Sequence, residues 1–439
     1  MIILLLGTHL FLTVRLRFPQ RHILKAIRLS VRKDKGAEGD VSQFGALVTA
    51  LAATIGTGNI VGVGTAIALG GPGAVFWCWL TGILGMATKY GEGLLAIKYR
   101  LSDSRGRMQG GPMYALERGL GMGWLGVLFA LFTAVASFGI GSTVQANAIS
   151  TMSQNVFGLQ PVVIGGIVTI LASMVIVGGV KNIAKVCTAL VPLMALLYIV
   201  GCIVILCMNA GFVWPAVKLI CSSAFNPAAA GGGFAGGSIM LAARFGIARG
   251  LFSNESGLGS APIVAAAAKT KNPVRQALVS STGTFWDTVV ICAMTGVVIV
   301  SSILAFPDIS FENGGELTTK AFSKIPYIGA PLLAFGSLTF AFSTILGWSY
   351  YGERAVEYVA GKPGLKRIVK PRTMVNLYRG LFLVTVYLGA VVSLDLVWNL
   401  ADIFNALMAI PNLISLVLLS GVIVKETRKY LWEGDLDRD

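Results

Sequence analysis

Two long apolar stretches of the sequence are interrupted by small and hydrogen-bonding residues that could bind an ion or a charged group. The interruptions read ATIGTGNIVG at 53–62 and RGLFSNESGLGSAP at 249–262. Glycine destabilises a helix, and Ser, Thr and Asn side chains compete for backbone hydrogen bonds. Backbone groups freed within lipid must be satisfied by protein, water or a ligand. Freed N–H groups at a helix start suit a carboxylate, and freed carbonyls suit a cation. Both interruptions are therefore candidate binding segments.

Close packing of small residues is the alternative explanation for the first interruption, since Gly58 and Gly62 have GxxxG spacing. The presence of two interruptions favours binding. They begin two groups of five apolar segments, at about 41–209 and 233–424. Inverted-repeat transporters place their discontinuous helices at such positions. Because five is odd, the second group would start from the opposite side of the membrane, as inversion requires.

Polar and small residues of the two interruptions are expected to face a bound molecule. These candidates are Gly56, Thr57, Gly58, Asn59, Phe252, Ser253 and Asn254. Backbone amides at 56–59 and 253–254 could bind a carboxylate, whereas freed carbonyls and the Asn254 side chain could accept from an ammonium group. Thr57 and Asn59 have a second interpretation as caps of the restarted helix. Gln145, in the fourth apolar segment, is a weaker candidate.

Three acidic residues lie within apolar segments, where a charge is costly and usually functional. We predict that Glu92 accepts backbone N–H groups of the interrupted helices. Asp287 could bind a cation, exchange a proton or brace the seventh segment. Glu255 is expected to pair with Arg244 or Arg249, either as part of a gate or as a structural bridge.

The composition places these segments in a membrane protein. Of 439 residues, 55% are hydrophobic and 13% are charged, and the mean hydropathy is +0.76. A soluble protein of this length has about 25% charged residues. Eleven apolar segments recur along the chain as far as Val424, and most are long enough to cross a bilayer. The sequence therefore predicts an all-α integral membrane protein with eleven transmembrane helices. One is an extra N-terminal helix, and the others form two inverted five-helix repeats, each starting with a helix broken in mid-membrane.

The distribution of positive charge supports this count. The 35 Lys and Arg residues outnumber 20 Asp and Glu residues, which gives a net charge of +15. With the amino end outside, 27 of these cations fall in one set of connections, and only Lys218, Lys320 and Lys324 fall in the other. Cytoplasmic connections are enriched in Lys and Arg. The first set, which includes the tail, is therefore predicted to be cytoplasmic, and the positive charge indicates orientation and not nucleic-acid binding.

The segments divide the chain into six parts. They are an extra N-terminal transmembrane helix (1–14), a basic segment (15–40), the first five-helix repeat (41–209), an extracellular connection (210–232), the second repeat (233–424) and a cytoplasmic tail (425–439). The stretch from Arg15 to Lys35 mixes cations with Ile, Leu and Val, which suits an interfacial helix on the inner leaflet. A solvated loop is an equal alternative.

The sequence lacks the residues that several classes of function require. The only histidines are His9 and His22, and the six cysteines show no CxxC spacing. The Gly-rich stretch at 231–237 lacks the GK[ST] of a phosphate-binding loop. An intramembrane protease would need a histidine base, and no histidine follows His22. A channel would show a filter signature, and none is visible in the sequence. We therefore expect no enzymatic activity, no cofactor and no nucleic-acid partner, and the sequence indicates no obligate protein partner.

The sequence resembles the alanine or glycine:cation symporter family over essentially its whole length. The resemblance rests on the stretches 54–62 (TIGTGNIVG), 86–92 (MATKYGE), 250–262 (GLFSNESGLGSAP) and 285–287 (FWD). It implies a leucine-transporter-type fold and sodium-driven import of small neutral amino acids, alanine or glycine, by alternating access. The expected setting is the lipid of the cell membrane. The alternatives are a proton-coupled or other-substrate transporter of the same fold and, less favoured, a channel.

The resemblance also implies where sodium would bind. In leucine-transporter-type folds a recurring sodium site joins the first broken helix to the eighth core helix. Matched onto this chain, the site comprises the carbonyls of Ala52, Ile55 and Phe340 and the hydroxyls of Ser343 and Thr344. Oxygen ligands suit hard cations, although such hydroxyls also bond routinely to the preceding helical turn. Trp348, one turn further along, is either a core aromatic or a wall that limits the size of the substrate.

Overall fold

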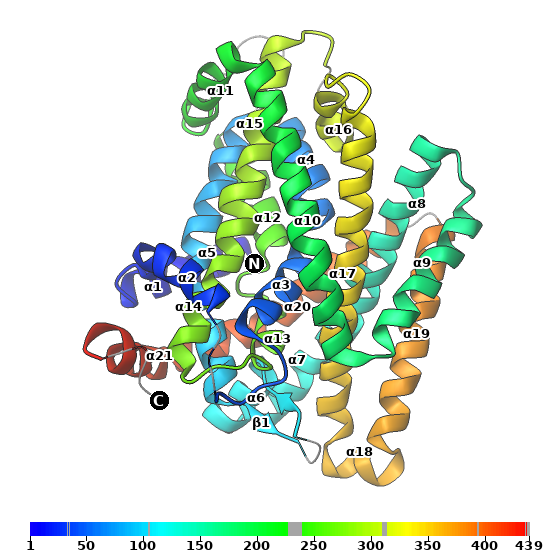
Figure 1. The fold of residues 1–439 in the computed structure, drawn as a ribbon. Helices are drawn as coiled ribbons and strands as arrows, with labels where there is room; N and C mark the ends of the chain where they lie inside the picture. Colours follow the sequence, from blue (N-terminus) through cyan, green and yellow to red (C-terminus); the bar gives the residue numbers. More distant parts are fainter. Residues whose placement is uncertain are drawn as a thin grey trace.

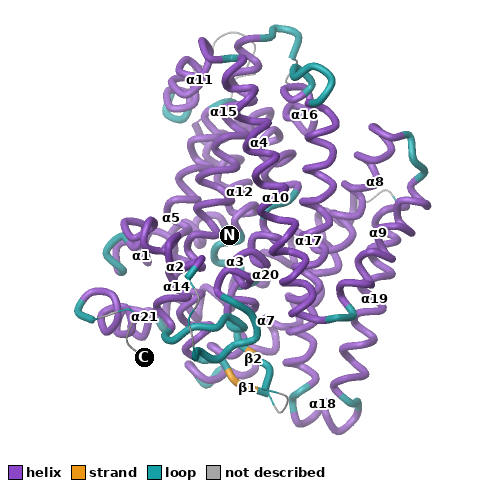
Figure 2. Tube along the Cα trace, in the orientation of Figure 1, coloured by secondary structure: helices purple, strands orange, loops and turns teal. Residues whose placement is uncertain are grey.

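The computed structural model describes residues 1–32, 34, 36–103, 106–226, 239–309, 314–392, 395–434 and 436. These residues form a bundle of helices (Figures 1 and 2). The strands in this part of the chain are β1 (Leu101–Ser102) and β2 (Met108–Gln109), which pair antiparallel in a short hairpin. The predicted all-α class is therefore correct.

The helices follow one another with short connections. The first half of the chain forms α1 (Ile2–Arg15), α2 (Ile23–Val31), α3 (Gln43–Thr54), α4 (Val63–Gly70), α5 (Gly73–Lys98), α6 (Pro112–Tyr114), α7 (Gly123–Ala136), α8 (Val144–Phe157), α9 (Pro161–Ile176), α10 (Gly179–Met208) and α11 (Ala210–Ser223). The second half forms α12 (Ile239–Asn254), α13 (Ala261–Ala265), α14 (Pro273–Thr284), α15 (Ala293–Ala305), α16 (Leu317–Phe322), α17 (Gly329–Ala360), α18 (Pro363–Ile368), α19 (Pro371–Val391), α20 (Asp395–Leu418) and α21 (Ser420–Thr427). Short π-helical segments lie at 58–62, 115–119, 137–143, 285–292 and 428–432, and 3₁₀ turns lie at 19–22 and 314–316.

Within the described residues, five helical segments are long and apolar enough to cross a membrane. They are Gly123–Phe157, Gly179–Met208, Pro273–Ala305, Gly329–Ala360 and Pro371–Val391. Three further pairs of helices qualify when each pair is taken as one bent span, which gives up to eight crossings. These counts rest on length and composition. They indicate a multi-pass membrane protein, and eleven crossings remain a prediction.

The first predicted interruption is present in the structure. α3 ends at Thr54, and Ile55 is extended, with φ −74° and ψ 103°. The chain restarts at Gly58 as a π-helical segment that leads into α4. The axes of the two halves differ by 54°. The carbonyls at the end of α3 therefore lack their usual partners in a following helical turn.

The second predicted interruption separates α12 from α13. Between these helices Glu255, Gly257 and Gly259 have positive φ angles of 53°, 90° and 84°. A positive φ is unfavourable for a residue with a side chain. The conformation of Glu255 is therefore held by contacts from neighbouring helices, which are described below.

The broken helices lie inside the bundle. α5 packs along α12 and α14, and α17 contacts α3, α8 and α10. In Figure 1, α8, α9 and α19 lie side by side, away from α5 and α14. The interruptions are thereby enclosed by intact helices. Side chains of these helices can form hydrogen bonds with the freed backbone groups or leave them without partners.

The structure adds detail to four of the expected segments. The basic segment contains α2, which follows α1 at a 65° bend, so residues 23–31 are helical and not a loop. The place of this helix at the inner leaflet remains a prediction. The expected connection at 210–232 contains the helix α11, which was not predicted. Pro215 lies in its second turn, where it removes only a bond to the helix start. The expected start of the second repeat, 233–238, lies outside the described residues. The last apolar segment bends by 55° between α20 and the helix that follows, and that helix continues into the expected tail as far as Trp432.

Candidate functional site

The five residues predicted to bind a cation lie together where α3 meets α17. The Ser343 hydroxyl is 3.2 Å from the Ala52 carbonyl and 2.8 Å from the Phe340 carbonyl. The Thr344 hydroxyl is 3.0 Å from the carbonyl of Ala52, 3.1 Å from that of Phe340 and 3.5 Å from that of Ile55. Five oxygen atoms from two helices therefore gather in one place, and all five residues are buried.

The first interruption explains why the Ala52 carbonyl is available. In a continuous helix this carbonyl would accept the N–H of Gly56. The Gly56 N–H donates instead to Oδ1 of Asn59, at 2.9 Å. The Ile55 N–H still reaches the Leu51 carbonyl, at 2.8 Å. Ala52 thus supplies the first carbonyl that the end of α3 releases, and the side chains of α17 contact it.

Asp287 connects the two interruptions. It lies in the π-helical segment 285–292 and is fully buried. Its Oδ1 accepts from Nδ2 of Asn59, at 2.8 Å, and its Oδ2 accepts from the hydroxyls of Ser253, at 2.9 Å, and Thr288, at 2.7 Å. Of the three roles that the sequence left open for Asp287, these contacts directly show the bracing role.

Asn59 and Ser253 are therefore already engaged. Asn59 accepts the N–H of Gly56, which precedes the restarted helix, and donates to Asp287. The N-cap position, Thr57, makes no side-chain cap bond, so the interpretation of these residues as N-caps of the restarted helix is not supported. The Ser253 hydroxyl donates to the same carboxylate. Phe252 packs against Gly58, where an added Cβ would lie 3.2 Å from the Phe252 ring. These contacts hold the two interruptions against each other and leave the side chains of Asn59 and Ser253 occupied.

Three buried polar atoms at the interruptions have no hydrogen-bond partner within the described part of the chain. They are Oγ1 of Thr57, Nδ2 of Asn254 and Oε1 of Gln145. Asn254 uses its other side-chain atom, Oδ1, to accept the N–H of Ser256 at 2.9 Å. Gln145 reaches the first interruption from α8, and its Oε1 is 3.6 Å from the position of a Cβ on Gly56. Buried polar atoms are costly without partners, so these atoms mark where a polar ligand would be accepted.

The prediction for Glu92 is confirmed. Its Oε1 accepts the N–H groups of Gly257, at 3.0 Å, and Gly259, at 3.1 Å. It also accepts from Nδ2 of Asn412, at 2.7 Å. Both glycines have positive φ angles. Glu92 therefore supports the backbone of the second interruption from α5.

The predicted pairing of Glu255 with an arginine is wrong. Its Oε1 accepts from Nε1 of Trp348, at 3.2 Å, and its Oε2 accepts from the hydroxyl of Ser260, at 2.5 Å. Arg244 and Arg249 instead lie near the rings of Phe245 and Phe252, at 5.6 and 6.0 Å from the ring centres. The reason is the left-handed backbone at Glu255, which directs its side chain towards α17 and not back along α12.

Trp348 is fully buried beside the second interruption. Besides its bond to Glu255, its Cβ lies against Gly141, where an added Cβ would approach to 2.3 Å. Gly141 belongs to the π-helical segment between α7 and α8. The ring is thus held in one orientation by an acid and a close backbone. Its role as a wall of the binding site remains a prediction.

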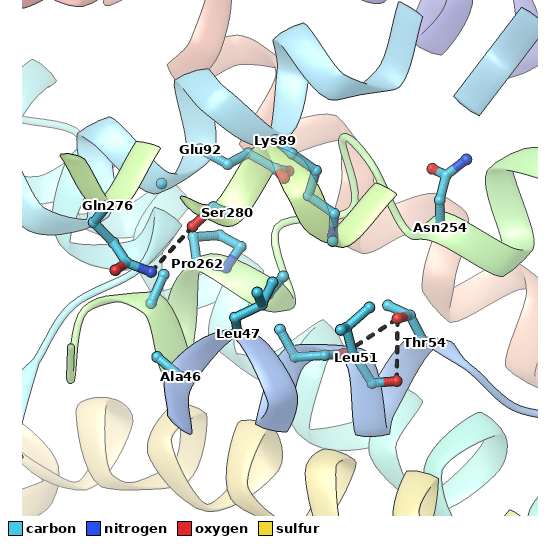
Figure 3. A pocket seen from close by; sticks show the side chains of 15 residues that line it. Ala46, Leu47, Leu51, Thr54, Lys89, Glu92, Asn254, Pro262, Gln276 and Ser280 are labelled. Carbon is cyan, nitrogen blue, oxygen red and sulfur yellow. Dashed lines mark hydrogen bonds between the residues drawn. The ribbon is translucent and has the colours of Figure 1, made fainter. Parts of the chain in front are cut away.

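A cavity lies between α3 and the helices α5, α13 and α14 (Figure 3). Lys89 reaches from α5 into this space, and Glu92, Asn254 and Thr54 also line it. Nζ of Lys89 is 3.4 Å from the carbonyl of Glu255. Lys89 was not among the predicted binding residues, although it lies in the stretch 86–92 that carries the family resemblance, because a single cation in an apolar segment does not indicate its partners. The structure places this ammonium group beside both the second interruption and the inner face of α3.

Comparison with solved structures identifies the class of fold. The crystal structure of MhsT in complex with L-phenylalanine matches 92% of this chain and 96% of its own, with a TM-score of 0.61 and 15% identity. The substrate-bound outward-open structure of a Na⁺-coupled sialic acid symporter matches 95% of this chain and 97% of its own, with a TM-score of 0.57 and 12% identity. The chain therefore has a fold that is used by a sodium-coupled symporter.

Comparison of sequences identifies the family. The model of the sodium:alanine symporter family matches residues 1–438. The sodium/alanine symporter AgcS of Methanococcus maripaludis is 51% identical over 438 residues, which cover 98% of this chain and 94% of AgcS. The probable sodium/glutamine symporter GlnT of Bacillus subtilis is 36% identical, over 100% of this chain and 89% of GlnT. This chain belongs to the sodium:alanine symporter family.

Proposed function

We propose that this protein is a sodium-coupled secondary active symporter that imports alanine, glycine or a similarly small neutral amino acid by alternating access. The observation that carries the proposal is the meeting of the Ala52 carbonyl, freed by the first interruption, with the Ser343 and Thr344 hydroxyls of α17. Family membership supports sodium as the coupling ion and alanine as a substrate.

The cation would bind among the five oxygen atoms between α3 and α17. Rotation of the two hydroxyl protons away from the carbonyls would present hydroxyl lone pairs, which, with the carbonyls, are ligands suited to a hard cation. A cation held in this way fixes the first broken helix against α17. If the substrate binds better to this fixed arrangement, sodium raises substrate affinity, and substrate raises sodium affinity by the same factor.

The substrate would bind at the two interruptions. The backbone N–H groups of Thr57 and Gly58 and Nδ2 of Asn254 would donate to its carboxylate, since the N–H groups of Gly56 and Asn59 are already engaged. Oε1 of Gln145 and Oγ1 of Thr57 would accept from its ammonium group. Phe252 and Trp348 would leave little room for the side chain. This arrangement refines the role of Asn254, because its Oδ1 is engaged by Ser256 and only its donor is open.

The energetics of one cotransported sodium are sufficient for import. A tenfold sodium gradient supplies about 1.4 kcal/mol, and a potential of 100 mV adds about 2.3 kcal/mol for one charge. The total of about 3.7 kcal/mol sustains roughly a 500-fold gradient of a neutral zwitterion. No ATP is needed.

The proposal includes the arrangement in the membrane. Eleven transmembrane helices would form one extra helix and two inverted five-helix repeats in the cell membrane, with the carboxyl-terminal tail in the cytoplasm. The charge distribution supports this orientation, because 27 Lys and Arg residues fall on the predicted cytoplasmic side.

Counterflow of labelled alanine in proteoliposomes tests the function. We expect saturable exchange that requires sodium, is not supported by potassium, and is inhibited by glycine. Exchange driven equally well by a proton gradient without sodium would favour the proton-coupled alternative. Counterflow of labelled glutamine but not of labelled alanine would favour another substrate, and flux that does not saturate would indicate a channel.

A further inference from the structure

An apolar groove on the outside of the bundle, which the proposed transport cycle does not use, lies between α2, α3 and α10. Its walls include Ile27, Val31, Leu51, Ala195 and Trp286. The groove has a volume of about 220 Å³, and its lining is almost wholly apolar. Because the protein spans a membrane, the medium outside an apolar opening of this kind is lipid.

One cation of α2 flanks the groove. Arg28 follows the lining residue Ile27 and precedes the lining residue Val31 by three positions. Arg28 is exposed and makes no ion pair within the described part of the chain. Leu24 and Val31, one turn before and after Arg28, are 72% and 69% exposed. A helix that presents both cations and large apolar side chains is typical of segments that lie in the membrane interface.

We propose that the groove binds one anionic phospholipid of the surrounding membrane, with an acyl chain between α2, α3 and α10 and the phosphate beside Arg28. The apolar lining selects the acyl chain, and the unpaired guanidinium of Arg28 selects a negative headgroup. A free phosphate ion would leave the groove unfilled, and a neutral lipid would leave Arg28 without a counter-charge.

The bound chain would brace the first broken helix. Leu51 and Ile55 both line the groove. The carbonyl of Ile55 and that of the intervening Ala52 face Thr344 on α17. One short stretch of the chain therefore has lipid on one side and the cation ligands on another. This coupling rests on the proposed function, whereas the lipid site itself does not.

Quenching of Trp286 fluorescence tests the site in the full-length protein. The protein is reconstituted into liposomes that contain a small fraction of brominated phosphatidylglycerol or brominated phosphatidylcholine. The signal of Trp286 is obtained by subtracting that of Trp286→Phe. We expect half-maximal quenching at a mole fraction of phosphatidylglycerol severalfold lower than that of phosphatidylcholine. Equal quenching by the two lipids would overturn the headgroup selection, and absence of quenching by both would show that no acyl chain enters.

Two variants distinguish recognition of the lipid headgroup from binding of the acyl chain, and a third variant is a control. Arg28→Gln is expected to weaken the preference for phosphatidylglycerol about fivefold, which is the effect of one cation near the membrane surface. Arg367→Gln removes an exposed cation of α18, remote from the groove, and should leave the preference unchanged. Ala195→Phe fills the groove and should reduce quenching by both lipids. Equal loss of preference in the two arginine variants would show general surface charge and overturn the site.

Transport provides the second measurement. Sodium activation of alanine uptake is compared with and without phosphatidylglycerol. We expect the lipid to lower the half-saturating sodium concentration in the parent but not in Ala195→Phe. Quenching without any effect on sodium would retain the lipid site and overturn only its coupling to α3. Absence of sodium-dependent uptake under all conditions would instead contradict the proposed function and leave the quenching result standing.

Discussion

Thr344 offers the sharpest test of the proposed cation site. Its hydroxyl contacts the Ala52, Phe340 and Ile55 carbonyls. Thr344→Val replaces this hydroxyl by a methyl group of similar size, so the packing of α17 against α3 is retained. The Ala52 carbonyl keeps its contact with the Ser343 hydroxyl. The expected loss of stability is therefore about 1 kcal/mol, the value of one neutral hydrogen bond.

The expected loss of sodium affinity is larger. A polar contact to a charged group is worth about 1.5–3 kcal/mol, which corresponds to roughly a 10- to 100-fold rise in the half-saturating sodium concentration. Substrate affinity measured with subsaturating sodium should fall in consequence, because the two ligands are linked. Without sodium, substrate should bind to the variant as it binds to the parent. Equilibrium binding of labelled alanine to purified protein, with and without sodium, measures both quantities.

Thr339→Val is the matched control. Thr339 lies on the same helix, and among the described residues its hydroxyl bonds to the preceding turn alone, at the Phe335 and Gly336 carbonyls. It should leave sodium affinity unchanged. Equal weakening of substrate binding by Thr344→Val in the presence and absence of sodium would refute the proposed cation site. In that case the hydroxyl serves the substrate or the fold, and the cation binds elsewhere.

Three further predictions concern specificity, stability and topology. Trp348→Ala should relax discrimination against larger amino acids such as leucine by one to two decades, since each methylene in an apolar pocket is worth about 1–3 kcal/mol; an unchanged inhibition profile in a folded variant would assign the ring to the core. Glu92→Leu should lower the melting temperature in detergent much more than Glu92→Gln, because glutamine retains an acceptor for the two glycine N–H groups; similar losses in both variants would contradict this role. Cysteines placed at Lys218 and at Lys366 should react with an impermeant reagent from opposite sides of the membrane, and labelling of both from one side would refute the proposed topology.

Local features of the fold could be predicted from the sequence. The first interruption depends on Gly56, Gly58 and Asn59, which disfavour a helix wherever they lie. The end of α3 then fixes which carbonyls are freed. The grouping of Ala52 with Ser343 and Thr344 followed from a family resemblance, since no local pattern connects residues that are so far apart in the chain.

Features that depend on direction in space could not be predicted. Glu255 was expected to pair with an arginine because both lie in one apolar segment, but a single left-handed residue turns its side chain towards Trp348. Asp287 had three possible roles in the sequence, and only the packing shows that it holds Asn59 and Ser253. Gln145 was a weak candidate because one polar residue in a helix has no periodic signal, yet its oxygen faces Gly56.

The contact between Asn59 and Asp287 has a consequence for how the protein is made. The two residues are separated by 228 positions. At about 5–20 residues synthesised per second, roughly 10–45 s pass between the appearance of the asparagine and that of its partner. During this interval the first broken helix must reside in or beside the insertion machinery with its amide donors unmatched. We therefore expect nascent chains that stop before residue 287 to be retained there, and chains that extend past it to be released into the bilayer.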